Sequence, residues 1–151
     1  MNKIEVKITN KIINQKFSFP TYSTIGSSGL DLRACLENKI ILNSQETILI
    51  PTGIEIYIKN PHITALIVPR SGLGHNKGIV LGNLIGVIDS DYQGQIMISL
   101  WNRSKKKFYI HPYSRIAQML FVPIIKPTFS IVKKFKKTLR NKNGFGHSGI
   151  Q

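Results

Sequence analysis

The chain has 151 residues and a mass of 17.0 kDa, with 42% hydrophobic and 19% charged residues, which is the size and composition of one globular domain. Its 21 lysines and arginines against 7 aspartates and glutamates give a formal net charge of +14. No apolar run is long enough to cross a membrane, and the first seven residues alternate polar and apolar instead of forming the apolar stretch of a signal peptide.

Short alternating runs predict strands along most of the chain. The first run is 4–8, where Ile4, Val6 and Ile8 alternate with polar side chains. Further runs rich in β-branched residues predict strands at 40–42, 47–50, 54–58, 63–68, 79–81, 96–100, 108–110, 116–122 and 129–132. Turn signals stand between them, at 51–53, 60–61, 91–94 and 111–113.

Only one segment favours a helix. A single helical turn is predicted at 71–77, with Ser71 near its N-cap and Gly78 at its end. The predicted fold is therefore all-β, a jelly-roll-like barrel or sandwich with at most one short helix.

The end of the chain differs from the rest. Residues 140–151 are small, polar and rich in glycine, and four lysines lie in the stretch before them. Such a composition does not form a buried strand and predicts a mobile tail. We therefore expect one β domain at 1–139 and a flexible arm of the same domain at 140–151.

The few carboxylates and one Gly-rich segment suggest chemistry. The chain has three aspartates, Asp31, Asp89 and Asp91, all in turn-like segments next to glycines. Aspartate is a common turn residue, but hard carboxylate oxygens also suit Mg²⁺. Residues 69–74, PRSGLG, offer a guanidinium, a hydroxyl and open backbone N–H groups that could cradle a phosphate.

The sequence gives less support to a zinc site or a cysteine nucleophile. The four histidines lie far apart, without metal-ligand spacing, and the single Cys35 excludes a zinc site built on several thiolates. Cys35 follows Ala34 in an apolar-flanked run, which favours core packing over a nucleophile. One cysteine cannot form an internal disulfide, which indicates a reducing compartment and a cytoplasmic protein.

Five segments in order resemble the motifs of the trimeric dUTPases (deoxyuridine triphosphate nucleotidohydrolases), in their bacterial branch. The segments are SGLDL at 28–32, PRSGL at 69–73 continuing to Gly78-Ile79, Asn83 with GVID at 86–89 and YQG at 92–94, RIAQ at 115–118, and RNKNGFGHSG at 140–149. Each segment alone is unremarkable, but five segments in the family's order and at its spacing are specific for the family. Together they span nearly the whole chain.

The resemblance implies a reaction and an assembly. Family members are jelly-roll homotrimers with sites at subunit interfaces, and the C-terminal arm closes over a neighbour's site. They use Mg²⁺ to cleave dUTP to dUMP and pyrophosphate by in-line attack of water on the α-phosphorus. This activity limits uracil incorporation into DNA and supplies dUMP for thymidylate synthesis.

The resemblance also implies roles for individual residues. Asp89 is expected to hold the attacking water, and Asp31 to act on the metal through water while the triphosphate holds Mg²⁺. Tyr92 is expected to stack under the deoxyribose, where a ribose 2′-OH finds no room. The remaining substrate-binding residues fall into three groups. The phosphate ligands are expected to be Arg70, Ser71, Gly72 and Gln118, and the uracil hairpin is expected to contribute Asn83, Val87, Ile88 and Met97. The closing arm is expected to contribute Arg140, Phe145, Gly146 and Ser148.

The tail departs from the family pattern. Asn141 and Asn143 stand where the family usually has glycines, and Ser28 stands where alanine is usual. Asparagine adopts left-handed backbone more easily than most residues, but less freely than glycine. No chemical group is lost by these changes, so only the rate or affinity of arm closure is affected.

Two alternatives remain. A charge of +14 is a common sign of a nucleic-acid-binding protein, which would carry aromatic and basic residues together on one sheet face. However, the sixteen lysines, eleven asparagines and twenty-five isoleucines fit a genome rich in A and T, so we expect no specific nucleic acid as partner. The related dCTP deaminases share the fold, but the segment at 83–94 and the tail argue against them.

Overall fold

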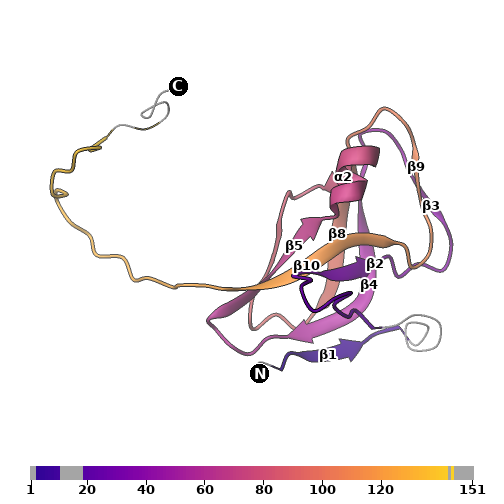
Figure 1. Ribbon diagram of the computed structural model, residues 1–151, viewed down its shortest axis with the longest axis horizontal. Coiled ribbons are helices and arrows are strands. Elements are labelled where there is room, and N and C mark those ends of the chain that lie inside the picture. Colours follow the sequence, from indigo (N-terminus) through magenta and orange to yellow (C-terminus); the bar gives the residue numbers. More distant parts are fainter. Residues whose placement is uncertain (1–2, 11–18, 143, 145–151) are drawn as a thin grey trace.

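The computed structural model describes residues 3–10, 19–142 and 144 (Figure 1). Within these residues the chain folds into ten strands and one short helix. The elements are β1 (Glu5–Ile8), β2 (Leu30–Arg33), β3 (Ile40–Leu42), β4 (Thr47–Tyr57), β5 (Ile63–Pro69), α2 (Ser71–Lys77), β6 (Ile79–Leu81), β7 (Gly86–Ile88), β8 (Gln95–Asn102), β9 (Phe108–Ile110) and β10 (Arg115–Pro123).

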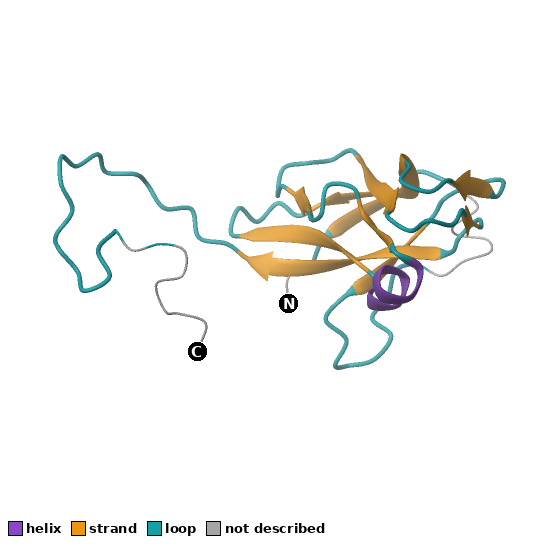
Figure 2. Ribbon diagram, turned by 90° about the horizontal axis from the view of Figure 1, so that it is seen from above, coloured by secondary structure: helices purple, strands orange, loops and turns teal. Residues whose placement is uncertain are grey.

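Two four-stranded sheets and a small two-stranded ribbon make up the body, with the helix at one end (Figure 2). The first sheet has the order β1-β4-β8-β6, the second β2-β10-β5-β7, and β3 pairs with β9. Antiparallel pairing joins strands distant in sequence, such as β2 and β10, which brings Asp31 opposite Gln118. The predicted all-β sandwich with one short helix is confirmed.

The core lies between the sheets and is almost entirely aliphatic. Ile96, Ile98 and Leu100 alternate along β8, are buried and belong to the same core cluster as Ile116 and Met119 of β10. Full burial of one such side chain stabilises the fold by about 1.5–3 kcal/mol. The alternation that predicted the strands is therefore the same alternation that builds the core.

The turn predicted at 51–53 is wrong, because β4 runs without a break from Thr47 to Tyr57. The register with β8 shifts between Pro51 and Glu55, which marks a bulge. At the bulge Gly53 has a φ of 73°, and its carbonyl accepts a hydrogen bond from the Thr9 N–H at 2.9 Å. Proline and glycine therefore bend a continuous strand here instead of ending it.

Three further expectations about strands fail. β2 and β7 are strands that the alternation did not predict; they are four and three residues long and pair only with β10 and β5 respectively. The predicted strand at 129–132 is absent: Phe129 is 96% exposed and Ile131 100% exposed, on an arm that leaves the body after β10 (Figure 1). No partner strand of the described chain reaches this arm.

The position of the helix and the packing of the cysteine are close to what the sequence predicts. Gly78 ends α2 in left-handed conformation with a φ of 69°, and its N–H bonds to the Leu73 carbonyl, as predicted. The N-cap is Arg70, and Ser71 follows it as the first helical residue, near the N-cap as predicted. Cys35 lies just beyond β2, packs against the core as predicted, and its burial raises the pKa of the thiol.

Candidate active site

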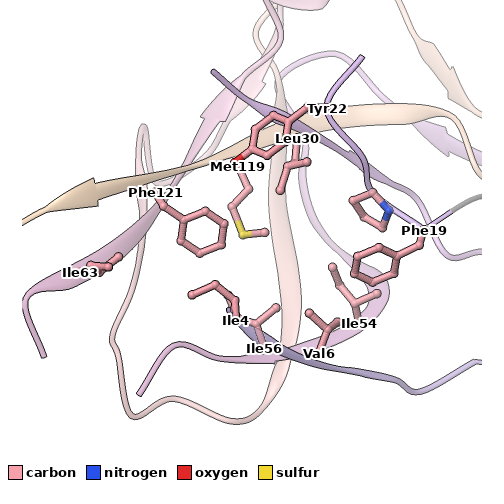
Figure 3. A pocket seen from close by; sticks show the side chains of 11 residues that line it. Ile4, Val6, Phe19, Tyr22, Leu30, Ile54, Ile56, Ile63, Met119 and Phe121 are labelled. Atoms are coloured by element: carbon pink, nitrogen blue, oxygen red, sulfur yellow. The ribbon is translucent and has the colours of Figure 1, made fainter. Parts of the chain in front are cut away.

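One hollow, lined by apolar side chains, does not suit a charged substrate. It measures about 370 Å³ and opens between the sheets beside β1, where Ile56, Met119 and Phe121 point into it together with Phe19 and Tyr22 (Figure 3). No charged side chain lines it among the described residues. A triphosphate would lose its hydration there without compensation, so the phosphate chemistry lies elsewhere.

The predicted phosphate ligands do come together. Arg70, Ser71, Gly72 and Gln118 line one open hollow of about 680 Å³ together with Asp31 and the segment 27–29. The residues come from the start of α2, from β10 and from β2 and the loop before it. We call this the phosphate hollow. Residues from three of the five motifs therefore meet in one place.

Asp31 organises the phosphate hollow by pairing with two arginines. Its Oδ1 accepts a hydrogen bond from Arg70 Nε at 2.8 Å, and its Oδ2 lies 3.4 Å from Arg115 Nε. The pair with Arg70 is partly buried, which strengthens it relative to a surface pair. Because Asp31 engages only Nε, the two terminal nitrogens of Arg70 keep their hydrogens for a ligand, and they bond to no described residue.

Arg115 is a residue whose role the sequence did not reveal. It opens the fourth motif, yet only the fold shows that it shares a carboxylate with Arg70. Local sequence gave no signal for this role, because residues three apart in a regular strand face opposite sides and only the bulge between Arg115 and Ala117 changes this relation to Gln118.

Gly29 lies beside Gln118 in the hollow. A Cβ at Gly29 would lie 2.9 Å from Gln118 Oε1, so a larger residue there would require that amide to shift. The Gln118 Nε2 donates to the Pro69 carbonyl at 3.1 Å, directly before Arg70. The small residues of the first motif therefore leave space for the glutamine side chain of the fourth motif.

The second group of predicted residues lies along the segment 83–97, the predicted uracil hairpin. It comprises β7, the loop after it and the start of β8, and these two strands lie in different sheets and do not pair. Asp89 is exposed, and its carbonyl accepts a hydrogen bond from the Tyr92 N–H at 3.2 Å. The Tyr92 hydroxyl donates to the Gln95 carbonyl at 3.0 Å, which folds the ring over Gly94. A Cβ at Gly94 would lie 2.7 Å from Cζ of that ring. Gly94 therefore determines where the ring of Tyr92 can lie.

One described chain does not unite the two groups. The lining of the phosphate hollow includes none of Asn83, Asp89 and Tyr92 in the part of the chain that the structure describes. The hairpin instead displays apolar side chains to solvent, with Val87 61% exposed. Also exposed along it are Leu84, Ile85, Tyr92 and Met97.

The predicted closing arm is described only at its beginning. Arg140 and Asn141 are exposed, and Asn141 adopts a left-handed φ of 47° while its N–H bonds to Thr138 Oγ1 at 3.0 Å. Asparagine thus adopts here a left-handed conformation, which it takes more easily than most residues. Asn143, Phe145, Gly146 and Ser148 lie outside the described residues.

The described residues hold no ready-made metal cage. No group of three or more His, Cys, Asp or Glu side chains gathers among them. Asp31 is the one carboxylate in the phosphate hollow, and each of its oxygens keeps a lone pair beside its arginine. This arrangement fits a Mg²⁺ ion that enters with a triphosphate and is reached by Asp31 through water, and it does not fit a metal bound by protein ligands alone.

Comparison with known proteins supplies the family. The dUTPase family model matches residues 15–149. The chain belongs to the dUTPase family. It is 65% identical over 150 residues to the deoxyuridine 5′-triphosphate nucleotidohydrolase of Buchnera aphidicola from Acyrthosiphon pisum (strain Tuc7), covering 99% of this chain and 97% of the relative. It is 55% identical over 151 residues to the enzyme of the same name from Escherichia coli O9:H4, covering 100% of both.

Solved dUTPase structures share the fold. The dUTPase of Staphylococcus bacteriophage 80alpha, solved with the analogue dUPNHPP, superposes with a TM-score of 0.86 at 24% identity and covers 99% of this chain and 100% of its own. A mutant dUTPase from phage phi11 of S. aureus, described as coordinating a structural Mg(II) ion, has a TM-score of 0.77 at 20% identity, covering 90% and 100%. The predicted jelly-roll fold is thereby confirmed. No described helix is long and apolar enough to span a membrane.

Proposed function

We propose that this chain hydrolyses dUTP to dUMP and pyrophosphate, which limits uracil incorporation into DNA and supplies dUMP for thymidylate synthesis. The observation that carries the proposal is the phosphate hollow, in which Asp31 orients Arg70 beside Ser71, Gly72 and Gln118. Family membership identifies the nucleotide that such a site takes in the close relatives.

The phosphate hollow binds and orients the triphosphate. Arg70 offers two free terminal nitrogens, Ser71 a hydroxyl, and Gly72 an unobstructed backbone, since nothing lies within 4 Å of where its Cβ would be. Guanidinium groups bind phosphate oxygens in a planar, two-pronged geometry. Mg²⁺ bound to the triphosphate, with Asp31 at its water shell, would further offset the charge of the departing pyrophosphate.

Asp89 positions the water that attacks the α-phosphorus. Asp89 is exposed directly after the end of β7, where a water molecule can bind between its carboxylate and a substrate. Holding that water in line and accepting its proton are the two contributions of this residue. Asn83 and the backbone of Val87, Ile88 and Met97 read the uracil, and Tyr92 stacks under the sugar.

The active form is a homotrimer with its sites between subunits. Among the described residues of one chain, the lining of the phosphate hollow does not include Asp89, and in this proposal a second copy supplies that half of the site. The arm after β10 also exposes large apolar side chains without a partner in the described chain, among them Ile125, Phe129, Ile131, Phe135 and Leu139. Exposed apolar surface on this scale is typical of an interface.

The arm of the neighbouring subunit completes the site. Residues 1–139 form the β domain in this proposal, and 140–151 form an arm whose Arg140, Phe145, Gly146 and Ser148 cover the bound nucleotide and exclude water. With one cysteine and no possibility of an internal disulfide, the enzyme is assigned to the cytoplasm.

A pyrophosphate-release assay with dUTP, dTTP, dCTP and UTP tests the function. We expect rapid release from dUTP alone in the presence of Mg²⁺. Ammonia released from dCTP would instead assign the chain to the deaminase alternative, and equal rates on all four nucleotides would contradict the proposed uracil and deoxyribose recognition.

Tyr92 should set the preference for deoxyribose. We expect Tyr92→Ala to reduce the ratio of kcat/KM for dUTP over UTP by about 10²-fold, because the ring occupies the space of a 2′-OH. Gly94→Ala should reduce the same ratio by roughly tenfold, because a Cβ there displaces the ring.

Gly26→Ala is the matched control for Gly94→Ala. Nothing lies within 4 Å of a Cβ at Gly26, so the ratio should stay at the wild-type value. An unchanged ratio in both Tyr92→Ala and Gly94→Ala would remove Tyr92 from the sugar pocket.

A further inference from the structure

A second hollow adjoins the phosphate hollow, and lysines line it. It measures about 680 Å³ and lies between the end of α2 and the loop that joins β8 to β9. Its lining includes Lys77, Lys105, Lys106, Lys107 and Tyr109, and we call it the lysine groove. Asn76 and Lys77 line both hollows, so the end of α2 is their common wall.

The loop that carries three of these lysines is held in place. Asn102 is fully buried, and its Nδ2 donates to the Leu42 carbonyl at 3.1 Å and to the Lys106 carbonyl at 2.8 Å. Its Oδ1 accepts from the Ser104 N–H at 3.0 Å. A fully satisfied buried amide of this kind rigidifies the backbone around it.

The same loop is fastened to the end of the helix. The Arg103 N–H donates to the Gly78 carbonyl at 3.0 Å, and Arg103 Nη2 to the Gly74 carbonyl at 3.4 Å. The lysine-bearing loop and Lys77 therefore keep a constant spacing. The charges therefore stay close together, while each long lysine side chain still loses rotamer freedom when it binds an anion.

The positive charge of the groove is not neutralised. All four lysines are exposed, and none forms an ion pair with the residues that the structure describes. The carboxylate of Glu46, on the turn between β3 and β4, accepts instead from the Asn43 N–H at 2.6 Å. The groove is a concentrated cationic surface directly beside the phosphate hollow.

The aromatic content of the groove argues against single-stranded nucleic acid. Tyr109 is its one exposed aromatic ring among the described residues, and the ring is contacted by Lys39 Nζ at 4.9 Å and Lys107 Nζ at 5.5 Å from its centroid. Phe108 points towards the core. Single strands are bound by successive exposed rings that stack on successive bases, and this face does not offer them.

We propose that the lysine groove is an accessory polyphosphate site, which captures the triphosphate of the incoming nucleotide and passes it to the phosphate hollow. The proposal rests on the proposed function for its ligand. A cationic cleft raises the association rate of an anion by about 10–10³-fold, and salt suppresses the effect. The screening length falls from about 30 Å at 0.01 M salt to about 3 Å at 1 M.

The test is the association rate of the non-hydrolysable α,β-imido analogue of dUTP, measured by stopped flow in the double variant Lys105→Gln/Lys106→Gln. This variant leaves the contact between Lys107 and Tyr109 intact. We expect the rate to fall by roughly threefold to tenfold at about 0.01 M salt and to match wild type near 1 M. The arginine double variant, Lys105→Arg/Lys106→Arg, should retain the wild-type rate.

A second double variant separates position from net charge. Lys3→Gln/Lys7→Gln removes the same charge at and beside β1, in the sheet that does not contribute to the phosphate hollow, and should keep the wild-type rate. The proposal is overturned if the association rate falls equally in both double variants, or if it does not fall in the loop variant, Lys105→Gln/Lys106→Gln. Loss of single-stranded DNA binding by the loop variant, with nucleotide association unchanged, would make the groove a nucleic-acid surface instead.

Inorganic tripolyphosphate makes the test independent of the proposed reaction. Titration calorimetry should show weaker tripolyphosphate binding to the loop variant than to wild type or to the β1 variant. Equal binding of tripolyphosphate to all three proteins would contradict the proposed role of the lysine groove. A wild-type protein that releases no pyrophosphate from dUTP would contradict the proposed function alone.

Discussion

Replacing Asp89 with asparagine is expected to lower kcat by roughly 10²–10⁴-fold while nucleotide binding persists, because a positioned general base contributes about that much. Asparagine keeps the shape and a hydrogen-bonding oxygen but cannot accept the proton of the attacking water. Steady-state kinetics on dUTP and calorimetry with the imido analogue separate the two effects. The dissociation constant should stay within a few-fold of wild type.

Asp91→Asn is the matched control, since Asp91 is exposed on the same hairpin two residues further on. We expect it to retain most of the activity. If Asp91→Asn is the inactive variant and Asp89→Asn is nearly normal, the assignment of the base is wrong.

Deleting residues 140–151 is expected to remove most catalysis and leave the fold intact. The stub ending at Leu139 loses no buried residue of the described chain. It loses Arg140 and the predicted covering residues Phe145 and Ser148, and with them the exclusion of water from the bound triphosphate. Circular dichroism and pyrophosphate release measure the two outcomes.

A shorter stub distinguishes the closing arm from the interface. The stub ending at Ile124 keeps the hydrogen bond from the Ile124 N–H to the His62 carbonyl, but it lacks the exposed apolar side chains of the arm. We expect size-exclusion chromatography to show a trimer for the stub ending at Leu139 and weakened assembly for the stub ending at Ile124. A monomeric longer stub, or one with full activity, would contradict the division at residue 139.

Local sequence was sufficient for most of the strands. The alternation in Ile96, Ile98 and Leu100 predicts both the strand and the buried face, because burial of every second side chain is itself the pattern. The helix at Ser71–Lys77 and its glycine stop were predictable for the same reason, since Gly78 adopts the left-handed conformation that other residues avoid.

Short strands and the bulge depended on distant partners. β2 and β7 contain four and three residues, and they become strands because β10 and β5 supply the hydrogen bonds. Pro51 and Gly53 indicate a turn locally, but pairing with β8 and a bond from Thr9 keep the chain extended. The apolar run at 129–132 looks like a strand, yet no described segment pairs with it.

The five motifs, and from them the family, could be recognised from the sequence alone, because the order and spacing of short segments are properties of the linear sequence. What the side chains do to one another was decided only by the tertiary structure. Asp31, Arg70 and Arg115 are far apart in sequence, and only the pairing of β10 with β2 and β5 makes their ion pairs. The lysine groove likewise needs buried Asn102 to hold its loop against α2, because charge becomes a binding surface only when the fold fixes its spacing.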